Sequence, residues 1–251
     1  MQGVITTAAS GDSGEARDLA ARFGLRAEDR AGRSLSRVLE ETGGAPVLVL
    51  AARRADLFEK GRTFRATAGM AYLRLLRARR GESDPLVAAA KLRRGETVLD
   101  ATLGLAGDAL LAAQATGTRV IGLEIDPVVA AFTLAGLRRL AAHAREPGQN
   151  VEVLKADHRE WLRKQPDGSF DVVLLDPMFR KAGDAGPLFD LLRAHASHEP
   201  LDSGTLREAR RVARRGVLVK DASPGHELRR LGLVPRISRR SAAIAFGWTG
   251  P

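Results

Sequence analysis

Four acidic residues stand at the ends of four successive apolar segments from residue 96 onward. They are Asp100 in TVLDAT, Glu124 in RVIGLEID, Asp157 in VEVLKAD and Asp176 in FDVVLLD. Each segment has the length and the Val/Leu content of a buried strand, and the carboxyl ends of parallel strands form the ligand-binding edge of a sheet. One acid in this position is often a helix cap, but four together indicate a single binding site. A carboxylate-lined edge favours a ligand that carries positive charge.

The segment after the first acid, ATLGLAGDAL, predicts a loop of small residues that leads into a helix. Gly104 and Gly107 would let a ligand approach the backbone, as in the first turn of nucleotide-binding sheets. The strict dinucleotide fingerprint is absent, because Thr102 stands where its first glycine would be. Asp108 at the start of the helix would repel a pyrophosphate, which again favours a cationic ligand. The alternative is an ordinary strand-to-helix turn.

The second acid, Glu124, lies 24 positions after Asp100. This is close to the ~20-residue interval at which an acid reaches ribose hydroxyls in such sheets. Acids at strand ends often serve as helix caps, but Asp126 followed by Pro127 already provides the cap here. Glu124 is therefore available to a ligand.

The four acids are positioned by a regular alternation of strands and helices. Strands are predicted at 97–102, 119–126, 151–157, 170–176 and 216–221, with two more between residues 233 and 248. Near-continuous Val and Leu runs that alternate with helices are typical of parallel sheets covered on both faces. We therefore predict an α/β fold with a Rossmann-like, doubly wound, mostly parallel sheet of seven strands.

The N-terminal residues predict a separate, small α/β unit. Strands at 3–8 and 46–52 flank two helices, and a longer helix is predicted to follow over 63–81. We therefore divide the chain into a small unit of residues 1–62 and a second domain of residues 63–251.

Composition excludes several classes of protein. The 251 residues include no cysteine, which excludes disulfides, thiolate-held metals and a cysteine nucleophile. The N-terminus lacks the pattern of a signal peptide, and no apolar run approaches the roughly 18–20 residues that a membrane span needs. These features predict a soluble, cytoplasmic protein.

The net charge of +10 suggests a polyanionic partner such as nucleic acid. The alternative is coding bias, because only six of the 40 basic residues are lysines and the chain is rich in Ala, Arg and Gly. The arginines of 63–81, among them Arg74, Arg77 and Arg80, are interpreted first as a solvated helix face and second as an RNA-binding stripe.

The motifs DATLGLAGDA, GLEIDPVVAA, ADH, LLDPMF and RGVLVKD, in this order, resemble those of a known group of enzymes. The chain looks like a class I S-adenosylmethionine-dependent methyltransferase. More narrowly, it resembles the family of the bacterial small-subunit rRNA guanine-N2 methyltransferase J over roughly residues 63–248. The resemblance implies S-adenosylmethionine as cofactor and RNA as partner. The cofactor-binding residues that it implies are Asp100, Thr102, Gly104, Gly107, Asp108, Glu124, Ile125, Asp157, His158 and Asp176.

The same resemblance identifies Asp176-Pro177-Met178-Phe179 as the transfer site. In amino-methyltransferases such a tetrad accepts hydrogen bonds from an exocyclic amine and stacks its base. Asp176 and the Pro177 carbonyl would hold the amine, and Phe179 would stack on a base taken out of its own stack. The implied reaction is direct in-line transfer, without a metal, to guanine N2 of small-subunit rRNA. Without the other motifs, a strand-end Asp that caps a turn beside a core Phe would be an alternative.

Three other functions are retained as alternatives: a SAM methyltransferase of another RNA, DNA or small molecule, a nicotinamide-dependent oxidoreductase, and a non-catalytic RNA-binding protein. The missing glycine and Asp108 count against the oxidoreductase. Lys220 is interpreted as a phosphate contact or a cap of the sheet. His195 and His198 are interpreted as exposed loop residues, because two histidines are too few for a convincing metal site.

Overall fold

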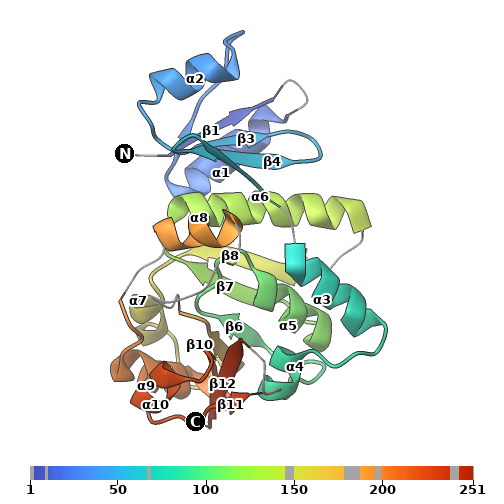
Figure 1. Cartoon of the computed structure of the whole chain (residues 1–251), viewed down its shortest axis with the longest axis vertical. Helices are drawn as coiled ribbons and strands as arrows, with labels where there is room; N and C mark the ends of the chain where they lie inside the picture. Colours follow the sequence, from blue (N-terminus) through green and yellow to red (C-terminus); the bar gives the residue numbers. More distant parts are fainter. Residues whose placement is uncertain are drawn as a thin grey trace.

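The computed structural model describes residues 3–8, 11–66, 69–144, 150–177, 187–195, 199–237 and 243–250. They form two β-sheets on opposite sides of the long helix α6 (Pro127–Ala144), as Figure 1 shows. The larger sheet carries the predicted ligand-binding edge, and the N-terminal residues form the smaller one. Within the described residues, no helix combines the length and the apolar character needed to cross a membrane.

The larger sheet has seven strands in the order β11-β12-β10-β9-β6-β7-β8, which confirms the predicted fold class. All neighbouring strands are parallel except β12, which runs antiparallel to both β10 and β11. From β6 the chain continues to β7 and β8 on one side and then crosses to β9 on the other. This reversal is the topological switch point, where open α/β sheets bind ligands. The strands are β6 (Val98–Asp100), β7 (Val120–Glu124), β8 (Val151–Lys155), β9 (Phe170–Leu175), β10 (Ala213–Ala222), β11 (Arg236–Ile237) and β12 (Ile244–Thr249).

Both faces of this sheet are buried, which explains the continuous apolar runs. Val172 and Leu174 of β9 pack in a core with α4, α5 and α6, whereas Val173 and Leu175 pack with α7, α9 and α10 on the other face. The helix α3 packs on α5. The helices besides α6 are α3 (Gly69–Arg79), α4 (Pro85–Ala90), α5 (Gly107–Thr116), α7 (His158–Arg163), α8 (Pro187–His195), α9 (Ser203–Val212) and α10 (His226–Arg230).

The smaller sheet has five strands in the order β2-β1-β3-β4-β5, three more than predicted. The first three are parallel, and β4 and β5 form an antiparallel hairpin. Its two-residue turn, Lys60-Gly61, has positive φ angles of 48° and 71°, as favoured hairpin turns require. The elements are β1 (Val4–Thr7), α1 (Ser13–Phe23), β2 (Arg26–Ala27), α2 (Leu35–Glu41), β3 (Val47–Leu50), β4 (Ala55–Glu59) and β5 (Arg62–Arg65).

The helix predicted over 63–81 is wrong at its start. Phe64 lies in β5 and pairs with Leu57 of β4, and α3 begins only at Gly69. Phe64 is buried in this position, so tertiary packing overrides the local helical pattern. The small sheet therefore ends at Arg65, three residues beyond the predicted boundary after residue 62. The division into two domains stays a prediction.

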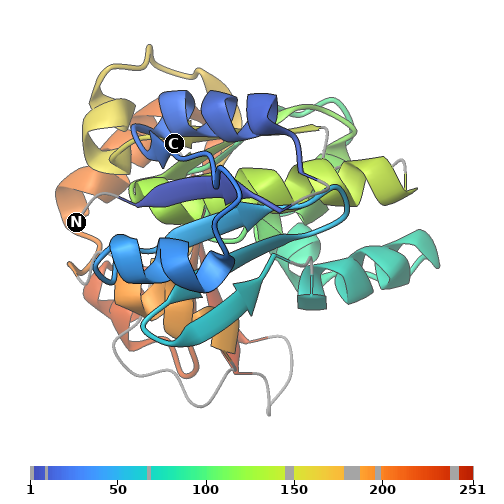
Figure 2. The same ribbon diagram turned by 90° about the horizontal axis from the view of Figure 1, so that it is seen from above.

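The two sheets are joined through α6, over which the small sheet lies in Figure 2. The buried Arg139 guanidinium on α6 donates to both carboxylate oxygens of Glu15, at 2.9 and 3.0 Å, and to the Ala51 carbonyl at 2.7 Å. Arg22 on α1 donates to the Val153 carbonyl of the edge strand β8 at 2.7 Å. Such satisfied buried contacts fix the small sheet against the larger one.

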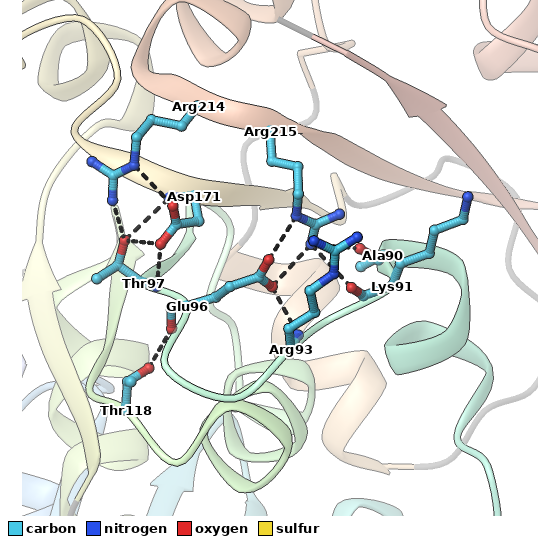
Figure 3. Close-up of polar contacts among 9 residues, drawn as sticks. All are labelled: Ala90, Lys91, Arg93, Glu96, Thr97, Thr118, Asp171, Arg214 and Arg215. Atoms are coloured by element: carbon cyan, nitrogen blue, oxygen red, sulfur yellow. Dashed lines mark hydrogen bonds and ion pairs between the residues drawn. The ribbon is translucent and has the colours of Figure 1, made fainter.

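Charged side chains tie together the amino ends of β6, β9 and β10 (Figure 3). Arg215 Nε donates to Glu96 Oε1 at 2.7 Å, and Arg215 Nη2 donates to the Ala90 carbonyl at 2.9 Å. Arg214 Nε donates to Asp171 Oδ1 at 2.8 Å, while the Thr97 backbone N–H donates to Asp171 Oδ2 at 2.8 Å. We call Glu96, Thr97, Asp171, Arg214 and Arg215 the amino-edge network.

Candidate active site

The four predicted acids all lie at the carboxyl edge of the large sheet. Asp100 and Glu124 are the last residues of β6 and β7, and Asp176 directly follows β9. Asp157 lies two residues beyond β8. Because β6 pairs with β9, Asp100 and Asp176 flank the switch point.

Thr102 connects the two strands of the switch point. Its hydroxyl accepts a hydrogen bond from the Asp176 backbone N–H at 2.6 Å, and its own N–H donates to Asp100 Oδ1 at 3.2 Å. The residue that replaces the expected glycine thus holds the loop in place. Burial, together with the nearby Asp108 carboxylate, raises the pKa of Asp100 to about 8. The Asp100 carboxyl is therefore mostly neutral at pH 7.

The loop between β6 and α5 is held close to β7 and α6. The Gly104 N–H donates to Glu124 Oε2 at 3.0 Å, and its carbonyl accepts from the Thr133 hydroxyl of α6 at 2.8 Å. Gly104 has φ 51°, a conformation that glycine adopts at little cost. On β7, a Cβ at Gly122 would lie 2.4 Å from Leu103 Cδ1, so only glycine lets the loop pack this closely.

Glu124 and Asp126 have separate roles, as the sequence predicts. Asp126 caps α6 by accepting from the N–H groups of Val128 and Val129 at 2.8 and 2.9 Å. Glu124 Oε1 accepts from the Asp126 N–H at 2.9 Å. Burial raises the pKa of Glu124 above its ordinary value. Each carboxylate oxygen has two lone pairs, so these bonds leave capacity for ligand hydroxyls.

Asp157 has partners that the sequence did not indicate. It caps α7 through the Arg159 N–H at 2.9 Å, and the Arg159 guanidinium donates to Asp157 Oδ2 at 2.7 Å. The hydrogen bond from Arg159 lowers the pKa of Asp157. Burial lowers the pKa of the neighbouring His158, which favours its neutral form. The adenine contacts of Asp157 and His158 stay predictions.

A cluster of alternating charges lies beside Asp176, and we call Arg74, Asp108, Asp176 and Lys220 the carboxyl-edge cluster. The Lys220 ammonium lies 2.5 Å from Asp108 Oδ2 and also bonds the Asp176 carboxylate. Arg74 Nη1 donates to Asp108 Oδ1 at 2.9 Å. Burial opposes the ionised form of Asp108, but Lys220 and Arg74 outweigh it and hold its pKa below the usual range. Asp108 is thus an anion beside the switch point.

Two cations of this cluster correct the sequence interpretation. Lys220 does more than cap the sheet, because its ammonium joins two acids from different elements, and its contact with phosphate stays a prediction. Burial alone would lower the pKa of Lys220, but these carboxylates raise it above its ordinary value. Arg74 does not belong to a solvated face, since it pairs with Asp84 and Asp108. The sequence patterns that locate strands and helices do not reveal such ion pairs.

The rest of the predicted tetrad is only partly described. Pro177 follows Asp176 at the edge and is partly buried. Met178 and Phe179 lie outside the described residues, and so does His198, so their predicted roles stay predictions. Ile125 is exposed at the edge, beside Glu124.

The interpretation of His195 as an exposed loop residue is wrong. It is the last residue of α8, and only 11% of its side chain is exposed. Its Nδ1 lies 2.9 Å from Asp126 Oδ2, and its Nε2 lies 2.9 Å from Glu59 Oε2. Sequence patterns could not reveal this contact, because the three residues are far apart along the chain.

Comparison with known proteins agrees with this geometry. The model of a family described as "Putative SAM-dependent methyltransferase" matches residues 67–230. The chain is 32% identical over 212 residues to the uncharacterized protein YpiP of Bacillus subtilis, covering 80% of each chain. It is 37% identical over 147 residues to ribosomal RNA small subunit methyltransferase J of Laribacter hongkongensis, covering 56% of this chain and 52% of that protein.

A crystal structure of the SAM-dependent methyltransferase NGO1261 from Neisseria gonorrhoeae has a similar fold, at a TM-score of 0.68 and 21% sequence identity. The similarity covers 99% of this chain and 96% of that chain, so it extends to the small N-terminal sheet.

Proposed function

The chain belongs to the family of SAM-dependent methyltransferases, and from this premise we propose that it methylates an exocyclic amine of an RNA base. The expected target is guanine N2 of small-subunit rRNA, in the cytoplasm. The observation that carries the proposal is Asp176 at the switch point, 37% exposed and held by the Lys220 ammonium. A relative named ribosomal RNA small subunit methyltransferase J supports rRNA as the substrate.

S-adenosylmethionine is the cofactor, and it supplies a methyl group on a positively charged sulfur. The carboxyl edge fits such a ligand. Gly104 has no side chain that would keep a ligand from the loop, Glu124 keeps lone pairs for hydroxyls, and Asp108 is an anion suited to a cationic group. We expect the methionine part to lie by Asp100, Thr102, Gly104, Gly107 and Asp108, the ribose by Glu124 and Ile125, and the adenine by Asp157 and His158.

Asp176 and Pro177 would orient the substrate amine. The lone pair of an exocyclic amine is delocalised into its ring, so the nitrogen needs aiming more than deprotonation. The Asp176 carboxylate would accept one N–H and the Pro177 carbonyl the other, which leaves the lone pair directed at the cofactor side. Lys220 restrains Asp176 for this task, and positioning of this kind accounts for most of the rate in such transfers.

The exposed side of α3 offers a path for the RNA backbone next to this cluster. Leu73, Arg77 and Arg80 follow each other at spacings of four and three residues and are exposed, whereas Leu75 is buried. Among the described residues, neither Arg77 nor Arg80 forms an ion pair. Arg74, on the preceding part of the same helix, is bound to Asp108. Cations without acidic partners beside the site suit phosphate contacts.

Modified-nucleoside analysis of rRNA tests the proposal. Small-subunit rRNA from a strain that lacks the gene should have lost one N2-methylguanosine, measured by mass spectrometry after digestion. The purified protein with S-adenosylmethionine should restore it on that rRNA or on the small subunit, and the Asp176→Ala variant should not. An unchanged set of rRNA nucleosides, with no transfer to rRNA in vitro, would rule the proposal out.

A further inference from the structure

One buried ion-pair triad connects the small sheet to the edge that holds the candidate site. His195 at the end of α8 lies between Glu59, the last residue of β4, and Asp126, the cap of α6. The side chains of His195 and Glu59 are 11% and 9% exposed. Glu59, His195 and Asp126 come from three elements that are distant in sequence, so this contact forms only when all three are in place.

Hydrogen bonds connect this triad to the candidate cofactor site. The Asp126 N–H donates to Glu124 Oε1 at 2.9 Å, and Glu124 Oε2 accepts from the Gly104 N–H at 3.0 Å. The helix that carries His195 also packs on this loop, because a Cβ built on Gly104 would lie 3.6 Å from Leu192 Cδ1. A continuous series of contacts thus runs from β4 to the glycine loop.

We propose that His195 is a positioning residue through which the small N-terminal sheet sets the affinity for S-adenosylmethionine. The triad holds Asp126, and Asp126 in turn orients Glu124 and the loop at Gly104. This inference rests on the proposed function, which assigns Glu124 and Gly104 to the cofactor. It gives the N-terminal sheet a role in binding the cofactor.

The Arg62–Asp190 ion pair, which also links the small sheet to α8, does not have these properties. Arg62 of β5 pairs with Asp190 of α8 at 2.9 Å, but the two side chains are 48% and 39% exposed. Within the described part of the chain, no hydrogen bond or ion pair joins either residue to Asp126, Glu124 or Gly104. Exposed pairs of this kind contribute little to stability. Arg62→Gln is therefore a matched control, since it also removes a link between the small sheet and α8.

The charged groups around His195 make the ion pairs of the triad depend on pH. Asp126 and Glu59 face its two nitrogens, Lys60 lies 3.7 Å from Glu59, and Asp190 and Arg193 pair with each other on α8. The hydrogen bonds that His195 donates to the Asp126 carboxylate and then to the Glu59 carboxylate outweigh burial and raise the pKa of His195 to about 9. The imidazolium is therefore present at pH 7, and both contacts weaken as the pH rises through about 9.

Calorimetric titration of S-adenosylmethionine tests the inference without relying on turnover. We expect His195→Gln and Glu59→Gln to weaken binding about tenfold at pH 7, as for loss of a charge-assisted hydrogen bond. Arg62→Gln should bind like wild type. The KM for the cofactor should rise in the two variants while kcat at saturation is retained. Wild-type affinity should fall relative to that of His195→Gln between pH 8 and about 10, because the variant lacks the group that titrates near 9.

A fourth variant, Glu124→Gln, separates failure of the inference from failure of the proposed site. If Glu124→Gln weakens binding but folded His195→Gln and Glu59→Gln variants bind like wild type, the inference is wrong and the proposed site stands. If Glu124→Gln itself binds like wild type, the proposed cofactor site is wrong and the inference falls with it. Thermal melting of each variant establishes that it is folded.

Discussion

Two networks of charged residues join the strands of the large sheet at its opposite edges, and they differ in how completely their charges are paired. In the amino-edge network each carboxylate has its own guanidinium, Arg215 for Glu96 and Arg214 for Asp171. The remaining N–H groups of Arg215 reach the Ala90 and Lys91 carbonyls. In the carboxyl-edge cluster the cations are shared: Lys220 lies between Asp108 and Asp176, and Arg74 lies between Asp108 and Asp84.

The pKa values of two acids show what this difference means. The hydrogen bond from Arg214 lowers the pKa of Asp171, so this carboxylate is stabilised as an anion. Burial raises the pKa of Asp100 to about 8, so this carboxyl is destabilised as an anion. A separate guanidinium for each carboxylate makes the amino edge a stabilising clamp, whereas shared cations and the buried Asp100 carboxyl make the carboxyl edge costly in stability.

The largest expected effect is loss of catalysis at the carboxyl edge. Asp176→Ala removes the acceptor that, on the proposed function, would orient the amine, and kcat should fall at least about 100-fold. RNA and cofactor affinity, measured by titration, should remain largely intact. Asp171→Ala, at the amino edge, should lower the melting temperature and leave kcat close to wild type. Equal loss of kcat in both variants would remove the distinction between the two edges.

The second effect concerns stability and pH. Between pH 4 and about 8 folded Asp100 keeps its proton while the unfolded chain loses it, so wild-type stability falls as pH rises. Asp100→Asn does not titrate, and its stability relative to wild type should rise by about 2–3 kcal/mol over this range. This change is smaller than the free energy that the whole pKa shift of Asp100 would give, because the site relaxes when the carboxyl ionises.

Asp171→Asn should behave in the opposite way. The lowered pKa of Asp171 contributes stability that is present above about pH 4 and is lost as pH falls. Urea denaturation against wild type measures the two slopes, between pH 4 and about 8 for Asp100→Asn and between about pH 2 and pH 5 for Asp171→Asn. Slopes of the same sign would contradict the comparison.

The third effect tests the amino edge as a clamp. Glu96→Ala leaves the partly buried Arg215 guanidinium without its carboxylate, and the free energy of unfolding should fall by about 2 kcal/mol. Because this edge faces away from the site, kcat should not change. Arg119→Ala breaks the more exposed pair with Glu152 and should cost less than about 0.5 kcal/mol. Chemical denaturation distinguishes these outcomes.

The smallest effect concerns RNA binding. The double variant Arg77→Glu/Arg80→Glu should raise the KM for RNA about fivefold at moderate salt and reduce the salt dependence of binding. Arg214→Gln removes a cation that is already paired, so it should lower the melting temperature without changing that KM. A KM that responds to Arg214 and not to α3 would place RNA at the opposite edge.

Sequence patterns predicted the large sheet well and the small one incompletely. Long Val and Leu runs and caps such as Asp126 are local signals, and the seven strands follow from them. The strand β2 has only two residues, and β5 resembles the start of the helix that follows. Phe64 becomes a strand residue only because Leu57 lies opposite it in the hairpin.

The candidate site was likewise predicted from the sequence only in part. Asp100, Glu124, Asp157 and Asp176 were predictable because a strand that ends in an acid carries it to a known edge of a parallel sheet. Their partners were not predictable: Lys220 meets Asp108 across 112 positions, and His195 meets Glu59 across 136. Arg159 is close to Asp157 in sequence, but only its side-chain conformation makes it a partner.

The amino-acid sequence by itself thus determined the order of strands and helices and the edge at which the acids gather, because apolar periodicity and capping act between neighbouring residues. The tertiary structure decided which cation meets which acid, which carboxyl stays protonated and how the N-terminal sheet reaches the site. These depend on burial and on distances of about 3 Å between residues far apart in the chain, which no local pattern encodes.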